Sequence, residues 1–169
     1  MKREGEEHKR TRNYVISIID KRIAGRSGLR RLFDDHTGGS NLKLYCQVAD
    51  VKTHLSSPDI LLLDDDNRLV ESIIEVKDQD VSPKNILGIL ASTSICNRFL
   101  DKDGAPYEIK ETQLYVVIND KVLSKIGSGK EDQMALIGER MPVNPSTISK
   151  YVICSEKKFE KKFAIRERH

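Results

Sequence analysis

The stretch SPDILLLDDDNRLVESIIEVKDQD, residues 57–80, decides how the rest of this chain is interpreted. It places Pro58-Asp59 at the start of one apolar run and Glu75-Val76-Lys77 at the end of the next. The turn-forming sequence DDDN separates the two runs, which predicts a β-hairpin. Two acids and a lysine would then meet at neighbouring strand ends, either as the rim of a solvated hairpin or as a metal-dependent catalytic site.

The pattern of alternate residues favours the second interpretation. Alternate residues of a strand share a face, so Glu75 and Lys77 point the same way. If the hairpin pairs about its turn, Asp59 and Glu75 lie close together, and they repel each other unless a cation lies between them. Two carboxylates with a backbone carbonyl, such as that of Val76, suit Mg²⁺. Lys77 would then hold or deprotonate a water, or stabilise the developing negative charge.

The remaining segments alternate between helical and strand patterns. Apolar residues recur at helical spacing over 6–24, and Pro83 stands in the first turn of a second helix. The expected order is a helix, three strands, a helix, a strand, a helix, a strand and a helix. This order predicts an α/β chain folded around a small mixed β-sheet flanked by helices. The segments are 6–24, 41–50, 58–63, 68–77, 83–99, 111–120, 130–141, 150–154 and 155–168.

The composition is that of one globular domain. The chain has 169 residues, of which 38% are hydrophobic and 33% charged, enough for one core. We interpret 1–169 as a single domain with a core over about 5–154 and a basic C-terminal helix over 155–169. The apolar runs are too short for a membrane span, the N-terminus lacks a signal peptide, and the three cysteines show no pairing pattern. A cytoplasmic protein is therefore expected.

Basic residues are concentrated after the first helix. The net charge of +3 is too small to indicate a nucleic-acid partner by itself. Arg22, Arg26, Arg30 and Arg31, however, lie close together in the chain. Such a cluster would follow the phosphates of a nucleic acid, and the alternative is a solvated surface on a lysine-rich chain.

Pro58-Asp59, a gap of fifteen residues and Glu75-Val76-Lys77 together resemble the PD-(D/E)XK nuclease superfamily, which includes restriction endonucleases and Holliday-junction resolvases. The resemblance covers the element order over about 5–120 and five residues of motif. It implies a restriction endonuclease-like core and Mg²⁺-dependent hydrolysis of DNA phosphodiester bonds, with Mn²⁺ as a substitute. Asp59, Glu75 and the Val76 carbonyl would bind the metal, and Lys77 would act on the water.

Two further residues are assigned from their positions. Members of the superfamily often carry another acid on the first helix, near the metal. Glu7 lies seven residues before Tyr14 and eleven before Ile18, which predicts that it points at the sheet as an outer ligand. The alternative is an acid that interacts favourably with the helix dipole. Gln79 shares the parity of Lys77 and would support the water or a phosphate; the alternative is a strand-end residue without a role.

The expected partner is double-stranded or branched DNA. Because one such site cuts one strand, a homodimer is expected for cutting both strands. The alternative function is non-catalytic DNA binding through IGERMPVNPSTISKY (137–151), which has helix-turn-helix character and would use Ser146 and Lys150 for recognition. Against it, Pro142 occupies a turn position that needs a positive φ, and the final KYVIC favours a strand.

Overall fold

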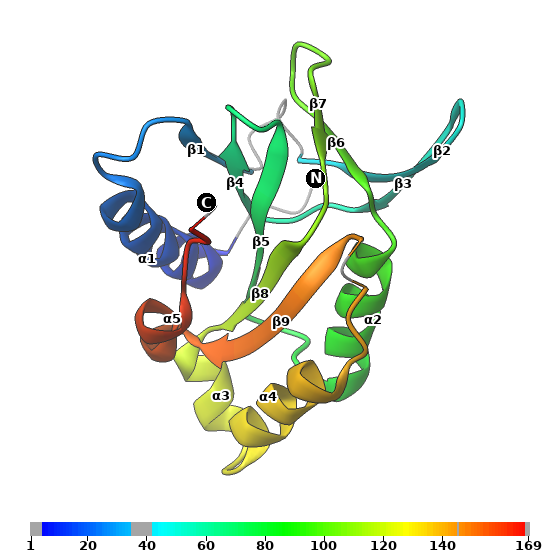
Figure 1. The fold of residues 1–169 in the computed structure, drawn as a ribbon. Helices are drawn as coiled ribbons and strands as arrows, with labels where there is room; N and C mark the ends of the chain where they lie inside the picture. The colour runs from blue at the N-terminus through cyan, green and yellow to red at the C-terminus, as the bar shows by residue number, and fades with distance from the viewer. Residues whose placement is uncertain (1–4, 35–41, 145, 168–169) are drawn as a thin grey trace.

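The computed structural model describes residues 5–34, 42–144 and 146–167. Figure 1 shows helices on both sides of a central sheet, so the predicted α/β class is confirmed. In chain order the elements are α1 (Glu6–Ile23), β1 (Leu29–Phe33), β2 (Leu44–Val48), β3 (Val51–Ser56), β4 (Ile60–Asp64), β5 (Leu69–Lys77), α2 (Pro83–Ser94), β6 (Arg98–Leu100), β7 (Pro106–Glu108), β8 (Thr112–Ile118), α3 (Asp120–Ile126), α4 (Lys130–Arg140), β9 (Ile148–Ser155) and α5 (Glu156–Lys162).

The sheet is mixed and has two branches. β1, β4 and β5 are antiparallel neighbours, whereas β5, β8 and β9 run parallel. A second branch leaves β5 through β7 and continues to β6, β2 and β3. The parallel pairs follow from the connections, because α2 lies between β5 and β8 in the chain, and α3 and α4 lie between β8 and β9.

The strands β4 and β5 are covered on both faces, which is why their sequences are apolar almost throughout. Leu61 and Ile73 enter the core beneath α2 and α4. Ile60 and Ile74 enter a second core, beneath α1 and α5, which lie side by side in Figure 1. The hairpin is therefore held from both sides, and the residues at its open end have a fixed position.

The structure corrects the predicted order of the first strands. The segment 41–50 does contain a strand, β2, but β2 pairs with β3 and β6 rather than with β4. The neighbour of β4 is β1, whose sequence LRRLF was interpreted only as part of a basic stretch. The second helix ends at Ser94 because residues 98–100 form β6. The last helix likewise ends at Lys162, before the predicted boundary.

The structure contradicts a helix-turn-helix over 137–151. α4 ends at Arg140, and residues 148–155 form β9, which pairs along β8. Lys150, expected at the start of a recognition helix, is paired with Gln113 in the sheet. The interpretation as a helix, a loop and a last strand is confirmed.

Burial keeps two of the three free cysteines unreactive. Cys96 and Cys154 are buried, whereas Cys46 is partly exposed. Burial raises the pKa of Cys96 and of Cys154 to about 12, so both thiols stay protonated.

Within the described ranges, none of the helices combines the length and the apolar character needed to cross a membrane.

Candidate functional site

The hairpin of β4 and β5 brings together the two carboxylates that the sequence singles out. Asp59 directly precedes β4, and its N–H donates to the Ile74 carbonyl across the hairpin at 3.2 Å. Glu75 is the next residue of β5. Asp59 and Glu75 are only 6% and 7% exposed, and their side chains interact with each other. Two acids thus share one small buried space at the strand ends.

The backbone of Val76 holds Asp59 in place. The Val76 N–H donates to Oδ2 of Asp59 at 2.6 Å. A residue in a strand directs its N–H and its C=O to the same side. The Val76 carbonyl therefore also faces the side of Asp59, where β4 has not yet begun. Two carboxylates and one carbonyl oxygen are arranged around this position.

Glu75 has an unfavourable electrostatic environment. Burial and the nearby charge of Asp59 raise the pKa of Glu75 to about 8, although Lys77 acts in the opposite direction. The Nζ of Lys77 lies 3.9 Å from Oε2 of Glu75, which is too long for a hydrogen bond. The charged form of Glu75 is therefore disfavoured, and a cation bound between the two carboxylates would favour it.

His8, in the first turn of α1, reaches the same site. Its Nε2 lies 3.0 Å from Oδ1 of Asp59, and its Nδ1 lies 3.3 Å from Oδ1 of Asp78. Burial lowers the pKa of His8, but the two carboxylates outweigh this effect and raise it overall. The sequence does contain a signal for this residue: His8 precedes Val15 by seven positions and Ile19 by eleven, and both are fully buried.

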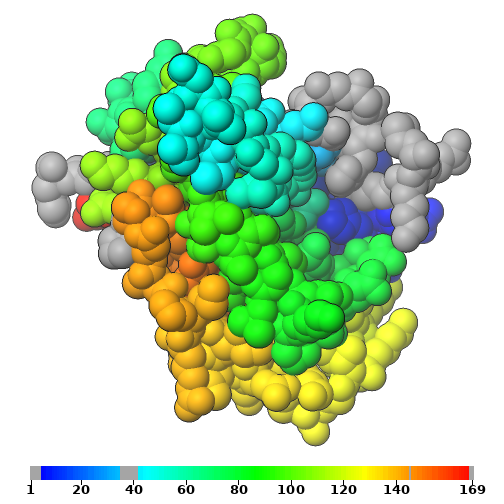
Figure 2. Space-filling model, turned by 90° about the vertical axis from the view of Figure 1, so that its right-hand side faces the viewer, coloured from blue at the N-terminus to red at the C-terminus, as the bar shows by residue number. Residues whose placement is uncertain are grey.

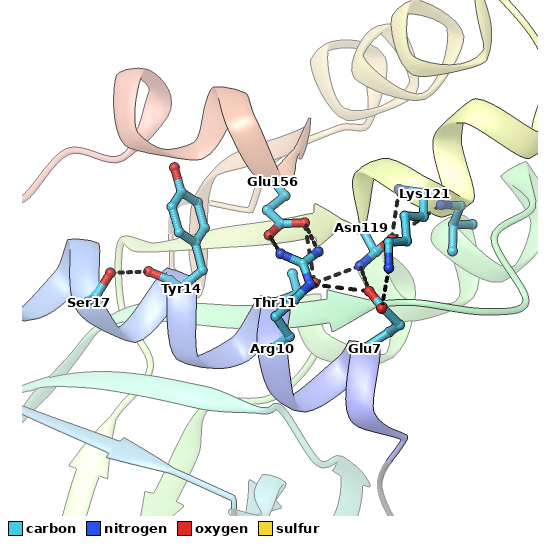
Figure 3. Close-up of polar contacts among 9 residues, drawn as sticks. Glu7, Arg10, Thr11, Tyr14, Ser17, Asn119, Lys121 and Glu156 are labelled. Atoms are coloured by element: carbon cyan, nitrogen blue, oxygen red, sulfur yellow. Dashed lines mark hydrogen bonds and ion pairs between the residues drawn. The ribbon is translucent and has the colours of Figure 1, made fainter.

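Glu7, expected as an outer metal ligand, has other partners (Figure 3). Its carboxylate accepts hydrogen bonds from Lys121, from Arg10 and from the Asn119 side chain. The hydrogen bonds from Lys121 and Arg10 lower the pKa of Glu7 to about 2. Of the two residues with which Glu7 was aligned, Ile18 is 3% exposed but Tyr14 is 36% exposed, so Glu7 lies at the edge of the buried face, and its role as an outer ligand stays a prediction.

Asp34 is a further acid that the sequence did not indicate. It follows β1 and is buried, and its N–H donates to the carbonyl of Asp59 at 2.8 Å. Its own carbonyl accepts a hydrogen bond from the buried Arg12 at 2.6 Å. β1 therefore supports the Asp59 backbone from the side opposite to β5.

A groove with a volume of about 620 Å³ opens beside Lys77. One wall is formed by α2 through Gly88, Ile89 and Ser92. The exposed Gln79 lines the same groove, so the structure places it beside Lys77 as its parity suggested. The space next to Gly88 is open, since a methyl group built there would have no atom within 4 Å.

The arginine-rich stretch does not lie beside these carboxylates. Arg30 and Arg31 belong to β1 and pair with Leu63 and Leu62. Arg30 is therefore about four residues along β4 from Asp59, or roughly 14 Å. The distance arises because β1 starts at the opposite end of β4, and the expected contact of this stretch with phosphates stays a prediction.

Most of these arginines also bind partners within the chain. Their guanidinium groups are hydrogen-bonded and thus less available to phosphates. The pairs are Arg22 with the Glu160 carbonyl, Arg30 with Asp65 and Asp101, and Arg31 with Asp20. Arg26 is exposed and lines a different hollow from the one beside Lys77.

No family model matches this chain, and no curated protein or solved structure matches it. Among the described residues, no group of three or more histidines, cysteines, aspartates or glutamates is arranged to hold a metal ion. The polar groups that the structure brings together at this site are the carboxylates of Asp59 and Glu75, the Val76 backbone and the nearby Lys77.

Proposed function

We propose that this protein is a Mg²⁺-dependent nuclease that hydrolyses phosphodiester bonds in DNA. The observation that carries the proposal is the buried pair of Asp59 and Glu75 beside Lys77 and an open groove. Two buried acids that repel each other destabilise a fold unless a cation compensates them. Carboxyl groups whose pKa is raised in this way, here to about 8, are concentrated at functional sites.

The order of the core elements supports the same proposal. α1 is followed by three antiparallel strands, β1, β4 and β5, then by α2 and the parallel strand β8. The ribbon of β2 and β3 interrupts this order between β1 and β4. The arrangement agrees with the restriction endonuclease-like core implied by the resemblance to the PD-(D/E)XK superfamily, whose acids lie at the same strand ends.

The donors at the site fit magnesium. Asp59, Glu75 and the Val76 carbonyl offer oxygen atoms only, which hard cations prefer over the nitrogen and sulfur ligands typical of zinc. Mg²⁺ usually keeps several waters and binds one or two protein carboxylates, so two acids are enough. When bound, Mg²⁺ polarises a phosphate oxygen and makes a water more acidic.

Lys77 and His8 would have different roles beside the metal. Lys77 is partly exposed at the groove, where its ammonium group would orient the water and stabilise the negative charge that develops on the phosphate. His8 touches Asp59 and Asp78, so it would act through Asp59 as a positioning residue. In the reaction the water oxygen bonds to phosphorus, the bond from phosphorus to the leaving oxygen breaks, and that oxygen takes up a proton.

The test is cleavage of a DNA panel with Mg²⁺, with Mn²⁺ and with EDTA. The panel contains a plasmid, a single strand, a flap and a four-way junction. Wild type is compared with Asp59→Asn and with Lys121→Ala, which removes a lysine that pairs with Glu7 instead. We expect metal-dependent cutting by wild type and Lys121→Ala, and none by Asp59→Asn. Cutting by Asp59→Asn at the wild-type rate, or no cutting by any sample, would overturn the proposal.

A further inference from the structure

β2 and β3 form a ribbon that projects from the body beyond the end of α2 (Figure 1). In Figure 2 the ribbon, in cyan, lies above α2, in green, on the same face of the molecule. The strands are antiparallel, and Val48 pairs with Val51 at the tip. Four consecutive residues of β3, Val51–His54, are exposed, so both faces of this strand meet solvent. A two-stranded ribbon of this kind contributes little stability by itself. The exposed ribbon is therefore a candidate contact surface for a partner.

The tip of the ribbon is apolar, and the next pair of residues is polar. Val48 and Val51 are 70% and 69% exposed, the highest values among the exposed large apolar residues of the described chain. The following pair is Gln47 with Lys52, and Lys52 is exposed. A small apolar end followed by hydrogen-bonding side chains suits base edges better than it suits a protein core.

The ribbon is joined to the groove through α2. At its base, Oγ of Ser56 lies 3.0 Å from Oγ1 of Thr93, next to Ser92, which lines the groove. The helix rises about 12 Å between Lys84 and Ser92, and the strand from Ser56 to Val51 adds about 17 Å. The path along the two elements is thus about 29 Å at most, which is shorter than one turn of a DNA duplex, about 34 Å.

We propose that the tip of the ribbon enters the major groove of a double-stranded nucleic acid that lies along α2. The inference rests on the proposed nuclease function for the reacting phosphate, and it specifies that function by making the substrate a duplex. The major groove of DNA, about 12 Å wide, admits a two-stranded β-ribbon. The valine methyl groups would contact thymine methyl groups, and Gln47 and Lys52 would reach base edges or phosphates.

Charge and area favour a duplex over a second copy of the chain. Lys52 in the ribbon and Lys84 in α2 are exposed, as is Lys43 directly before β2. The exposed acids are Asp50 in the ribbon turn and Asp80 before α2, so lysines predominate by three to two along this path. A stable protein interface buries about 800 Å² on each partner, which two valine side chains cannot supply. A duplex offers phosphates to the lysines and needs only a small apolar contact in its groove.

The test measures binding separately from cleavage. All samples carry Lys77→Ala, so that Mg²⁺ can be present, and the anisotropy of a fluorescent duplex is compared with that of its single strand. The double variant Val48→Ser/Val51→Ser is the test. Val143→Ser is the control, because this valine is also exposed, at 48%, but lies between α4 and β9. Melting temperatures establish that each variant is folded.

We expect the tip variant to bind the duplex at least about tenfold more weakly, a change of about 1.4 kcal/mol. Its single-strand affinity should change less than about twofold, and the control should match its parent. Equal duplex affinity in the tip variant and its parent, or a parent that does not bind duplex, would overturn the inference. So would a dimeric parent that becomes monomeric in the tip variant. If wild type cuts nothing but the tip variant loses duplex binding, the ribbon inference stands and the nuclease proposal fails.

Discussion

Two groups of acids meet the first turns of α1, and they differ in how their charges are compensated. At the sheet, burial and Asp59 raise the pKa of Glu75 to about 8. One position before His8, Glu7 is bonded to Lys121 and Arg10, which lower its pKa to about 2 (Figure 3). Glu7 is bonded to two cations, whereas Glu75 is buried next to a second acid and has Lys77 only at 3.9 Å. The opposite pKa shifts follow from this difference in neighbouring charge and burial.

Burial alone does not explain this difference. Glu156, at the start of α5, is 5% exposed, as buried as Asp59. Arg10 nevertheless donates to both of its carboxylate oxygens, at 2.7 and 2.9 Å, and Thr11 donates to one of them. The buried Glu156 thus forms a bidentate ion pair with Arg10. Asp59 instead has His8 at 3.0 Å and Glu75 has Lys77 at 3.9 Å, and this contrast can be tested.

The largest effect is expected from replacing Lys77 by alanine, with Lys121→Ala as the matched comparison. Lys77→Ala should lower metal-dependent cleavage by roughly 10²- to 10⁴-fold, because it removes the charge beside the reacting phosphate. Lys121→Ala should change the rate less than about threefold, because Lys121 only completes the ion pair of Glu7. Single-turnover rates at saturating Mg²⁺ measure both variants. Equal losses in the two variants would remove the distinction between the sites.

The contrast also explains which site residues the sequence could reveal. Asp59, Glu75 and Lys77 stand at the ends of apolar runs, where a polar residue is conspicuous. His8 does not stand at the end of an apolar run, and its place at the site depends on which face of α1 is turned toward the sheet. Alignment with Tyr14 and Ile18 favoured Glu7, whereas alignment with the fully buried Val15 and Ile19 favours His8.

The strands, too, could be predicted from the sequence only in part. β4 and β5 were predictable because both their faces are buried, which leaves long apolar runs. β1 was not, because Arg30 binds Asp65 in the turn of the hairpin and so places a charge inside a strand. β3, the second strand of the ribbon, was not predicted either, since Val51–His54 are exposed on both faces. Pairing partners that lie far apart in the chain decided both cases.

The next effect concerns stability and its dependence on pH without divalent metal. The folded-state pKa of Glu75, about 8, lies above its ordinary value of 4.5, so the folded protein binds the proton more tightly. Its contribution to stability is complete below the ordinary pKa and is lost as the pH rises through about 8. Glu75→Gln, which stays neutral, should therefore be more stable than wild type at high pH, by about 2–4 kcal/mol.

Urea unfolding in EDTA at a series of pH values measures this difference. The stability of Glu75→Gln relative to wild type should grow between about pH 5 and about pH 8.5. Glu7→Gln is the control with the opposite sign: its carboxylate is favoured as a charge, so its removal should lower stability at neutral pH. Parallel curves for wild type and Glu75→Gln would show that Glu75 is already compensated.

A smaller effect is expected at His8. Because His8 contacts Asp59, His8→Ala should raise the Mg²⁺ concentration for half-maximal cleavage by about 10- to 100-fold. The rate at saturating Mg²⁺ should largely recover, which a misfolded variant would not show. Glu7→Ala, one position away, should shift the Mg²⁺ dependence less than about twofold. A larger shift for Glu7→Ala than for His8→Ala would return the role of outer ligand to Glu7.

The smallest effect is expected on the structural side, at Arg10. Arg10→Ala removes the bidentate partner of the buried Glu156. In an interior without water, this change would strongly lower the stability of the fold. The Arg10 side chain is 49% exposed, so water replaces part of the lost interaction. We expect a loss of about 1–2 kcal/mol, or a melting temperature lower by about 2–8 °C, with unchanged Mg²⁺-dependent cleavage. Arg10→Lys keeps the positive charge but not the bidentate geometry, so its loss of stability should be smaller. If Arg10→Ala instead abolished cleavage at an unchanged melting temperature, the ion-pair network would belong to the catalytic site, and the contrast between the two groups of acids would be lost.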